Sequence, residues 1–168
     1  MDGTIVNRVA ESGIITLDLK DLLPRDDLAV IDLKDYLFMG MILKEKDFRA
    51  ALSAMDWTTY QDRIVVLTCS TDAIIPAWAY MLLATYLQPY ARQIHQGAPD
   101  NIMEQLWTGA AAQLPTEEYR DRRVVVKGCG DREVPASVYV AIATRLRPVA
   151  KSIMYGEACS AVPLFKRK

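Results

Sequence analysis

Three cysteines, Cys69, Cys129 and Cys159, are the residues of this chain whose type best suits chemistry. Their thiolates are soft, charged donors that suit zinc or an iron–sulfur cluster. An odd number of cysteines without a secretory signal argues against a disulfide framework. Three thiolates also leave one ligand position for another group, which is typical of reactive or transfer sites rather than closed structural ones. We therefore predict one shared metal or cluster site, although no Cys-x-x-Cys pair supports it locally.

An internal repeat positions two of these thiols. A shift of 59 residues aligns residues 60–97 with residues 119–156 without gaps. The identical pairs include Asp62 with Asp121, Val65 with Val124, Pro76 with Pro135, Tyr80 with Tyr139 and Gly97 with Gly156. Each copy contains a β-branched run, a turn-rich loop and a long apolar helical stretch, which predicts a strand, a loop and a helix. The segment that follows is either a last helical turn or a returning strand, and a returning strand makes each copy a parallel βαβ unit.

The repeat also predicts how the thiols meet. Cys69 and Cys129 lie in matching loops, off register by one residue. We expect these loops side by side at the carboxyl ends of neighbouring parallel strands, where open α/β sheets build their sites. If the last segment of each copy is a strand, Cys159 also lies at a carboxyl end. The position equivalent to Cys159 in the first copy is Asp100, a candidate oxygen ligand.

Three further residues compete with Asp100 as metal ligands: Asp72, Asp131 and His95. Asp72 and Asp131 also stand just before the predicted helices, where a carboxylate acts as an N-cap. A helix N-terminus beside each loop would favour the thiolate form of the cysteines.

Other interpretations of the cysteines stay open. Cysteines are often buried as small apolar side chains, and Cys69 or Cys129 could be the nucleophile of a thiol-dependent transferase or sulfur-relay protein. A Cys–His catalytic pair would need His95, the only histidine. No phosphate-binding loop, dinucleotide fingerprint or Gly-x-Ser-x-Gly elbow occurs. We lean against an enzyme.

The remaining segments complete an α/β fold with a mixed sheet covered by helices. Residues 14–19 and 28–33 suggest a hairpin-like strand pair around the polar turn 24–27. Residues 44–55 and 103–113 have helical patterns. We expect a single domain over residues 1–168, divided into an N-terminal strand pair and helix (1–58), repeat one (60–97), a linker helix (99–115), repeat two (119–156) and a C-terminal segment (157–168).

Composition excludes some classes of function. The 168 residues carry a net charge of −1, so no global field attracts nucleic acid or an anionic membrane. Residues 73–91 lack charge, but their flanking prolines favour a central buried helix over a membrane span. No basic, apolar leader precedes the fold, so we expect a cytoplasmic protein.

Four segments resemble the bacterial domain-of-unknown-function family 2480: residues 5–10, 43–49, 72–83 and 156–164. The resemblance covers nearly the whole chain. It implies that Cys69, Cys129 and Cys159 belong to family motifs and that the position of His95 varies. The family has no established activity, and the resemblance implies an association with iron–sulfur assembly.

The sequence therefore predicts an accessory or carrier protein that binds a metal or an iron–sulfur cluster through its three cysteines. Proteins of iron–sulfur assembly are the expected partners, and a homodimer is compatible with the sequence. A non-catalytic interaction module is the remaining alternative.

Overall fold

The computed structural model describes residues 13–23, 28–128, 133–157 and 160–168. Within the chain, two compact units are distinguished: the terminal unit, residues 1–23 with 104–168, and the central unit, residues 24–103. Each unit has its own main sheet and its own apolar core, and the central unit also contains a two-stranded hairpin. The α/β class is confirmed, whereas the single domain over residues 1–168 stays a prediction.

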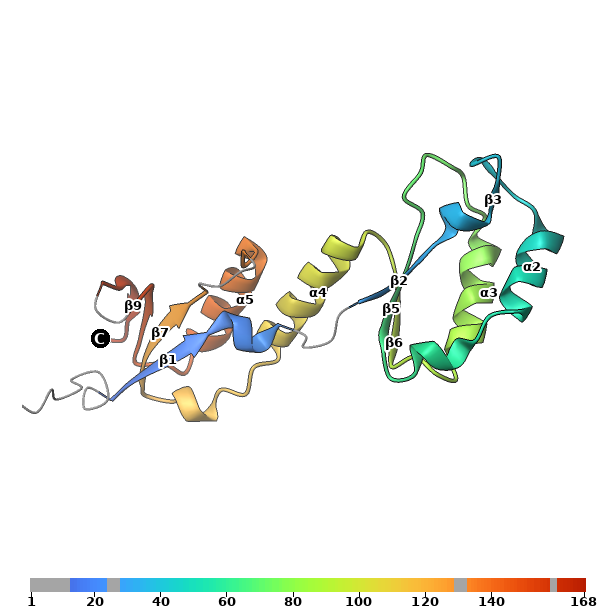
Figure 1. The fold of residues 1–168 in the computed structure, drawn as a ribbon. Coiled ribbons are helices and arrows are strands. Elements are labelled where there is room, and N and C mark those ends of the chain that lie inside the picture. The colour runs from blue at the N-terminus through green and yellow to red at the C-terminus, as the bar shows by residue number, and fades with distance from the viewer. Residues whose placement is uncertain (1–12, 24–27, 129–132, 158–159) are drawn as a thin grey trace, which may run out of the picture. The chain divides into compact units, whose positions relative to one another are not determined.

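The central unit is built on a three-stranded parallel sheet. Its strands, in spatial order, are β2 (Ala29–Asp32), β5 (Ile64–Thr68) and β6 (Gln93–Gln96). The other elements are η2 (Leu33–Tyr36), the hairpin strands β3 (Leu37–Phe38) and β4 (Ile42–Leu43), α2 (Glu45–Ser53), η3 (Trp57–Tyr60) and α3 (Ala77–Leu87). Phe48 and Leu52 of α2 join Leu83 of α3 in one core cluster, and the two helices lie side by side in Figure 1.

The terminal unit is built on a four-stranded mixed sheet. Its strands, in spatial order, are β1 (Ile14–Asp18), β7 (Arg123–Lys127), β8 (Ser152–Tyr155) and β9 (Val162–Lys166). The first three strands run parallel, and β9 pairs with β8 antiparallel. The helical elements are η1 (Leu19–Leu22), η4 (Glu117–Tyr119), α5 (Ala136–Leu146) and the part of α4 (Pro99–Ala112) from residue 104 onward. Val126, Ile142 and Trp107 lie in the core of this unit.

The last segment of each sequence repeat is a strand. β6 pairs in parallel with β5, and β8 pairs in parallel with β7. The elements β5, α3 and β6 are followed 59 residues later by β7, α5 and β8. Before each first strand, an aspartate takes a positive φ, 58° at Asp62 and 56° at Asp121, and each N–H donates to the carbonyl of Tyr90 or Val149 at 2.9 Å. Of the two alternatives for this segment, the βαβ unit is therefore the right one.

The predicted N-terminal hairpin is wrong. Strands form near residues 14–19 and 28–33, but β1 pairs with β7 and β2 pairs with β5, both in parallel. A central buried strand has two hydrogen-bonding edges, and β6 or β8 fills only one of them. The N-terminal strands β1 and β2 pair with the other edges of β7 and β5, respectively. The polar turn 24–27 lies outside the described residues.

Two predictions about helix α3 also need correction. The helix begins at Ala77, with Pro76 at the N-cap, so Asp72 lies outside it and does not cap it. Full burial is confined to Ala79, Leu83 and Leu87 on one face, other residues are only partly buried against the core, and Met81 is 69% exposed. Among the described residues, no helix has the length and apolar character that crossing a membrane requires.

Candidate functional site

Polar and thiol side chains gather at the carboxyl ends of the central sheet. Asp32 ends β2, Cys69 directly follows β5, and Gln96 ends β6. Tyr80 of α3 hydrogen-bonds to Gln96. Burial raises the pKa of Tyr80, and the neighbouring Cys69 and Asp32 raise it further against the effect of that hydrogen bond. This edge of the sheet is where open parallel sheets bind ligands.

Cys69 is half-buried at this edge and is a free thiol. Its Sγ lies 3.6 Å from the carbonyl oxygen of Thr71, and its side chain packs against the core of the central unit. The residue thus combines apolar packing with partial access to solvent. This combination is compatible both with a ligand and with a buried thiol.

The oxygen and nitrogen ligand candidates that the structure describes lie on three different elements. Asp72 is exposed in the loop after Cys69, and Asp100 is exposed in the first turn of α4. His95 lies on β6, and its Nε2 is 3.0 Å from Oε1 of Gln93. Over the described ranges, no group of three or more His, Cys, Asp or Glu side chains is placed to hold a metal ion.

Asp32 is the anchor of the loop that carries Cys69. Its Oδ1 accepts hydrogen bonds from the backbone N–H groups of Lys34 and Ser70, both at 3.0 Å. Lys34 Nζ lies 3.3 Å from Oδ2. Burial by itself raises the pKa of Asp32, but the hydrogen bonds from Ser70 and Lys34 outweigh it and lower the pKa to about 2. The ionised carboxylate therefore ties the end of β2 to the residue after Cys69.

We expect the Asp32→Asn variant to lose about 2 kcal/mol of unfolding free energy at pH 7. The folded state holds the pKa at about 2 against the ordinary 3.8, so this contribution is present above pH 3.8 and is lost as the pH falls toward 2. Urea unfolding at pH 7 and across this acid range measures the effect. Asp35→Asn, at an exposed position of the same turn, is the control and should change stability by less than about 0.5 kcal/mol. Equal pH profiles for Asp32→Asn and wild type would contradict the account.

The terminal sheet repeats part of this arrangement. Asp18 ends β1 and is 8% exposed, and its Oδ1 accepts from the N–H of Lys20 at 3.1 Å. Its Oδ2 lies 3.3 Å from Lys20 Nζ and 3.6 Å from Lys127 Nζ. Burial raises the pKa of Asp18, but the hydrogen bonds and charge of Lys20, with the charge of Lys127, lower it overall.

A short sequence signal marks both aspartates. The motif Asp-Leu-Lys-Asp occurs at residues 18–21 and again at residues 32–35. In both places the first aspartate ends a strand and caps a 3-10 turn. Asp18 and Asp32 are not among the site residues predicted from the sequence, because both lie outside the repeat of residues 60–97 and 119–156, although the Asp-Leu-Lys-Asp motif is visible in the sequence.

Cys129, Cys159 and Asp131 lie outside the described residues. The strands that lead to the two cysteines are described. β7 ends at Lys127, two residues before Cys129, and β8 ends at Tyr155, four residues before Cys159. These strands are parallel neighbours, and their last pair in register is Val126 with Tyr155.

The prediction that the strands before Cys69 and Cys129 are neighbours is wrong. β5 pairs with β2 and β6, whereas β7 pairs with β1 and β8. Both edges of each strand are occupied within its own sheet, so the two cannot pair with each other.

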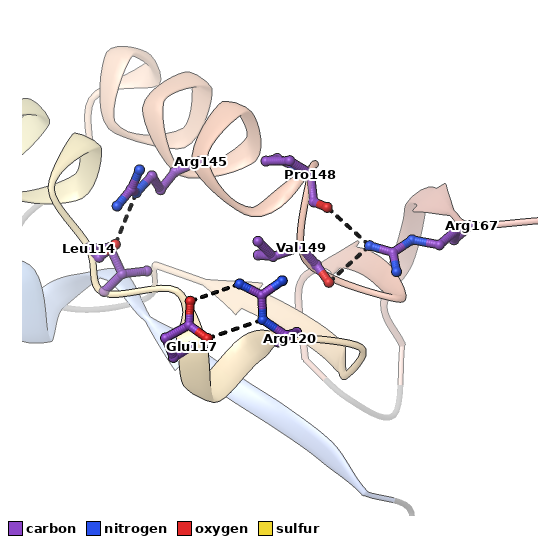
Figure 2. Close-up of polar contacts among 7 residues, drawn as sticks. All are labelled: Leu114, Glu117, Arg120, Arg145, Pro148, Val149 and Arg167. Atoms are coloured by element: carbon purple, nitrogen blue, oxygen red, sulfur yellow. Dashed lines mark hydrogen bonds and ion pairs between the residues drawn. The ribbon is translucent and has the colours of Figure 1, made fainter.

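Two arginine side chains hydrogen-bond to backbone carbonyls of the terminal unit (Figure 2). Arg167, just beyond β9, donates from Nη2 to the carbonyl oxygens of Pro148 at 3.1 Å and Val149 at 3.0 Å. Arg145 Nε donates to the carbonyl oxygen of Leu114 at 3.0 Å. The strand that follows the Cys159 segment is thus tied to the turn that precedes β8.

Comparisons with known proteins give a family and no activity. No curated protein and no solved structure matches the chain. The model of a family described as protein of unknown function (DUF2480) matches residues 3–167. This match covers nearly the whole sequence and agrees with the resemblance found in the four segments. The chain therefore belongs to the DUF2480 family.

Proposed function

We propose that this protein binds a metal ion or an iron–sulfur cluster through cysteine thiolates and acts as an accessory or carrier protein. The observation that supports it most is the pairing of β7 with β8. Two parallel strands in register end at one edge of a sheet, and each leads within a few residues to a cysteine, Cys129 or Cys159. Because the connections from the ends of β7 and β8 to Cys129 and Cys159 are short, they restrict the distance between these two thiols.

The chemistry of the proposed ligands is consistent with this function. Thiolates bind zinc at about 2.3 Å and hold iron–sulfur clusters, and a nearby positive charge favours the thiolate form of a cysteine. Lys127, two residues before Cys129 in the chain, carries such a charge, which it shares with the Asp18 carboxylate at 3.6 Å. Cys69 is the third proposed thiolate, and Asp100, Asp72 and Asp131 are the proposed oxygen ligands. Proteins of iron–sulfur assembly are the proposed partners.

The test is a series of single variants, Cys69→Ser, Cys129→Ser and Cys159→Ser, purified without oxygen. Each protein is titrated with zinc and, separately, reconstituted with iron and sulfide, and the bound metal is counted. We expect Cys129→Ser and Cys159→Ser to lose more than ten-fold in affinity, because a serine hydroxyl replaces a thiolate ligand. Cys69→Ser shows whether the third thiol shares the site.

His95→Gln is the matched control, because histidine is a common metal ligand that the proposal does not use. It should bind metal as the wild type does. Equal binding by wild type and all three cysteine variants would contradict the proposal. Rapid alkylation of Cys69 alone in metal-free protein would favour the thiol-dependent alternative.

A further inference from the structure

An apolar groove runs along α5 in the terminal unit, between this helix and strands β8 and β9. It consists of one cavity of about 560 Å³ and a second of about 190 Å³. Both cavities are lined by Ala143, Ile153 and Leu164, so they are parts of one groove. Ile153 is buried, whereas Leu164 on β9 is 58% exposed and forms an outer wall. The combined space is in the range of small-molecule sites.

The two ends of the groove differ in chemistry. Tyr139 and Tyr155, whose rings meet edge to face at 5.5 Å, line one end. Arg147 and Pro148 line the other end. Tyr139 and Arg147 are eight residues apart in the same helical segment, which corresponds to a groove of roughly 12 Å. The groove is therefore elongated and apolar, with a cation at one end.

Arg147 stacks on an aromatic ring and forms no ion pair with any carboxylate that the structure describes. Its guanidinium carbon lies 3.7 Å from the centroid of the Phe165 ring, which stacks the cation against β9. Its side chain makes no hydrogen bond or ion pair with any other residue that the structure describes. A guanidinium held by its face keeps its N–H edge available, and this edge matches a carboxylate in a bidentate manner.

The groove is a property of the terminal unit. The central sheet has the order β2-β5-β6, and over the described ranges it has no antiparallel strand in the place of β9. The residue of the central unit that corresponds to Arg147 is Gln88, which is neutral. In the terminal unit, β9 thus supplies the outer wall of the groove and Arg147 supplies its cation, whereas the described part of the central unit has neither feature.

From this geometry we propose that the groove binds a straight-chain carboxylate of about eight to ten carbons, a length that matches roughly 12 Å. The carboxylate pairs with Arg147, and the chain lies over Ala143 and Ile153 toward the tyrosine end. The charge of Arg147 is what selects this occupant over an uncharged chain. The site is separate from the proposed cysteine ligands, and its test does not depend on bound metal.

Titration calorimetry with decanoate, kept below its micelle-forming concentration, tests the proposal. We expect one saturable site per chain, and at least ten-fold weaker binding of decanol, which keeps the chain but loses the charge. Arg147→Gln should weaken decanoate binding by the same factor and leave decanol binding unchanged. Ala143→Leu, which fills the shared part of the groove, should abolish both.

Ala84→Leu is the matched control, because Ala84 occupies the corresponding position in α3 of the central unit. It should bind decanoate as the wild type does, and circular dichroism verifies that every variant is folded. The absence of saturable decanoate binding to wild type would overturn the proposal, as would equal affinities for decanoate and decanol. A wild-type dimer that Ala143→Leu dissociates, without decanoate binding, would instead identify a second copy as the occupant.

Discussion

Replacing Trp107 with alanine should lower the free energy of unfolding by about 3 to 5 kcal/mol, as is usual for large aromatic residues in cores. The indole is 1% exposed and lies in the core of the terminal unit. Its Nε1 donates to the carbonyl oxygen of Leu19 at 2.8 Å, so one side chain links α4 to the turn after β1. Alanine would leave both a cavity and an unpaired buried carbonyl.

Urea unfolding of Trp107→Ala and Trp107→Phe measures these two contributions separately. Phenylalanine fills most of the space but cannot donate, so we expect a loss of about 1 to 3 kcal/mol from the carbonyl that it leaves unpaired. Trp78→Ala is the control at a half-buried position and should cost less than Trp107→Ala. A loss below about 1 kcal/mol for Trp107→Ala would contradict the packing described for this core.

The second large effect is expected at Gly128, which separates the end of β7 from Cys129. A methyl group at this position would lie 2.8 Å from Val134 Cγ2 and would overlap the hydroxyl oxygen of Tyr139. Gly128→Ala therefore forces side chains or backbone to shift, and we expect a loss of about 1 to 3 kcal/mol. Thermal and urea unfolding measure it.

Gly109→Ala is the matched control for this prediction, and it should change the free energy of unfolding in the opposite direction. Gly109 lies inside α4, and a methyl group there meets no atom within 4 Å. Alanine at this position should raise stability by about 0.5 to 1 kcal/mol, because glycine is a poor helix residue. Destabilisation by both substitutions, or by neither, would contradict the close approach at Gly128.

The strand and the helix of each repeat could be predicted because their signals are local, whereas the sequence left the last segment open between a helical turn and a strand. β-branched runs, prolines before helices and a repeat at an offset of 59 residues appear directly in the sequence. The partners of β1 and β2 could not be predicted in the same way. The sequence of a short apolar strand does not show which edge of a sheet the strand joins. A polar turn between two such strands therefore favours a hairpin until the long-range pairing is known.

The candidate site was predictable in part. The sequence identified Cys69 as the residue that follows β5, and the family of the chain from four segments. It did not identify Asp32 as the anchor of the Cys69 loop, because that contact joins residues 38 positions apart. The groove along α5 depends on the antiparallel pairing of β9 with β8, which no local pattern in the sequence predicts.

The most direct test of the proposed metal function is the metal content of wild-type protein purified without oxygen, measured together with its absorption spectrum. The account predicts a stoichiometric metal ion or iron–sulfur cluster, either as purified or after reconstitution. Its binding should depend on Cys129 and Cys159. A colourless protein without stoichiometric metal, which neither zinc nor iron with sulfide can load, would contradict the account.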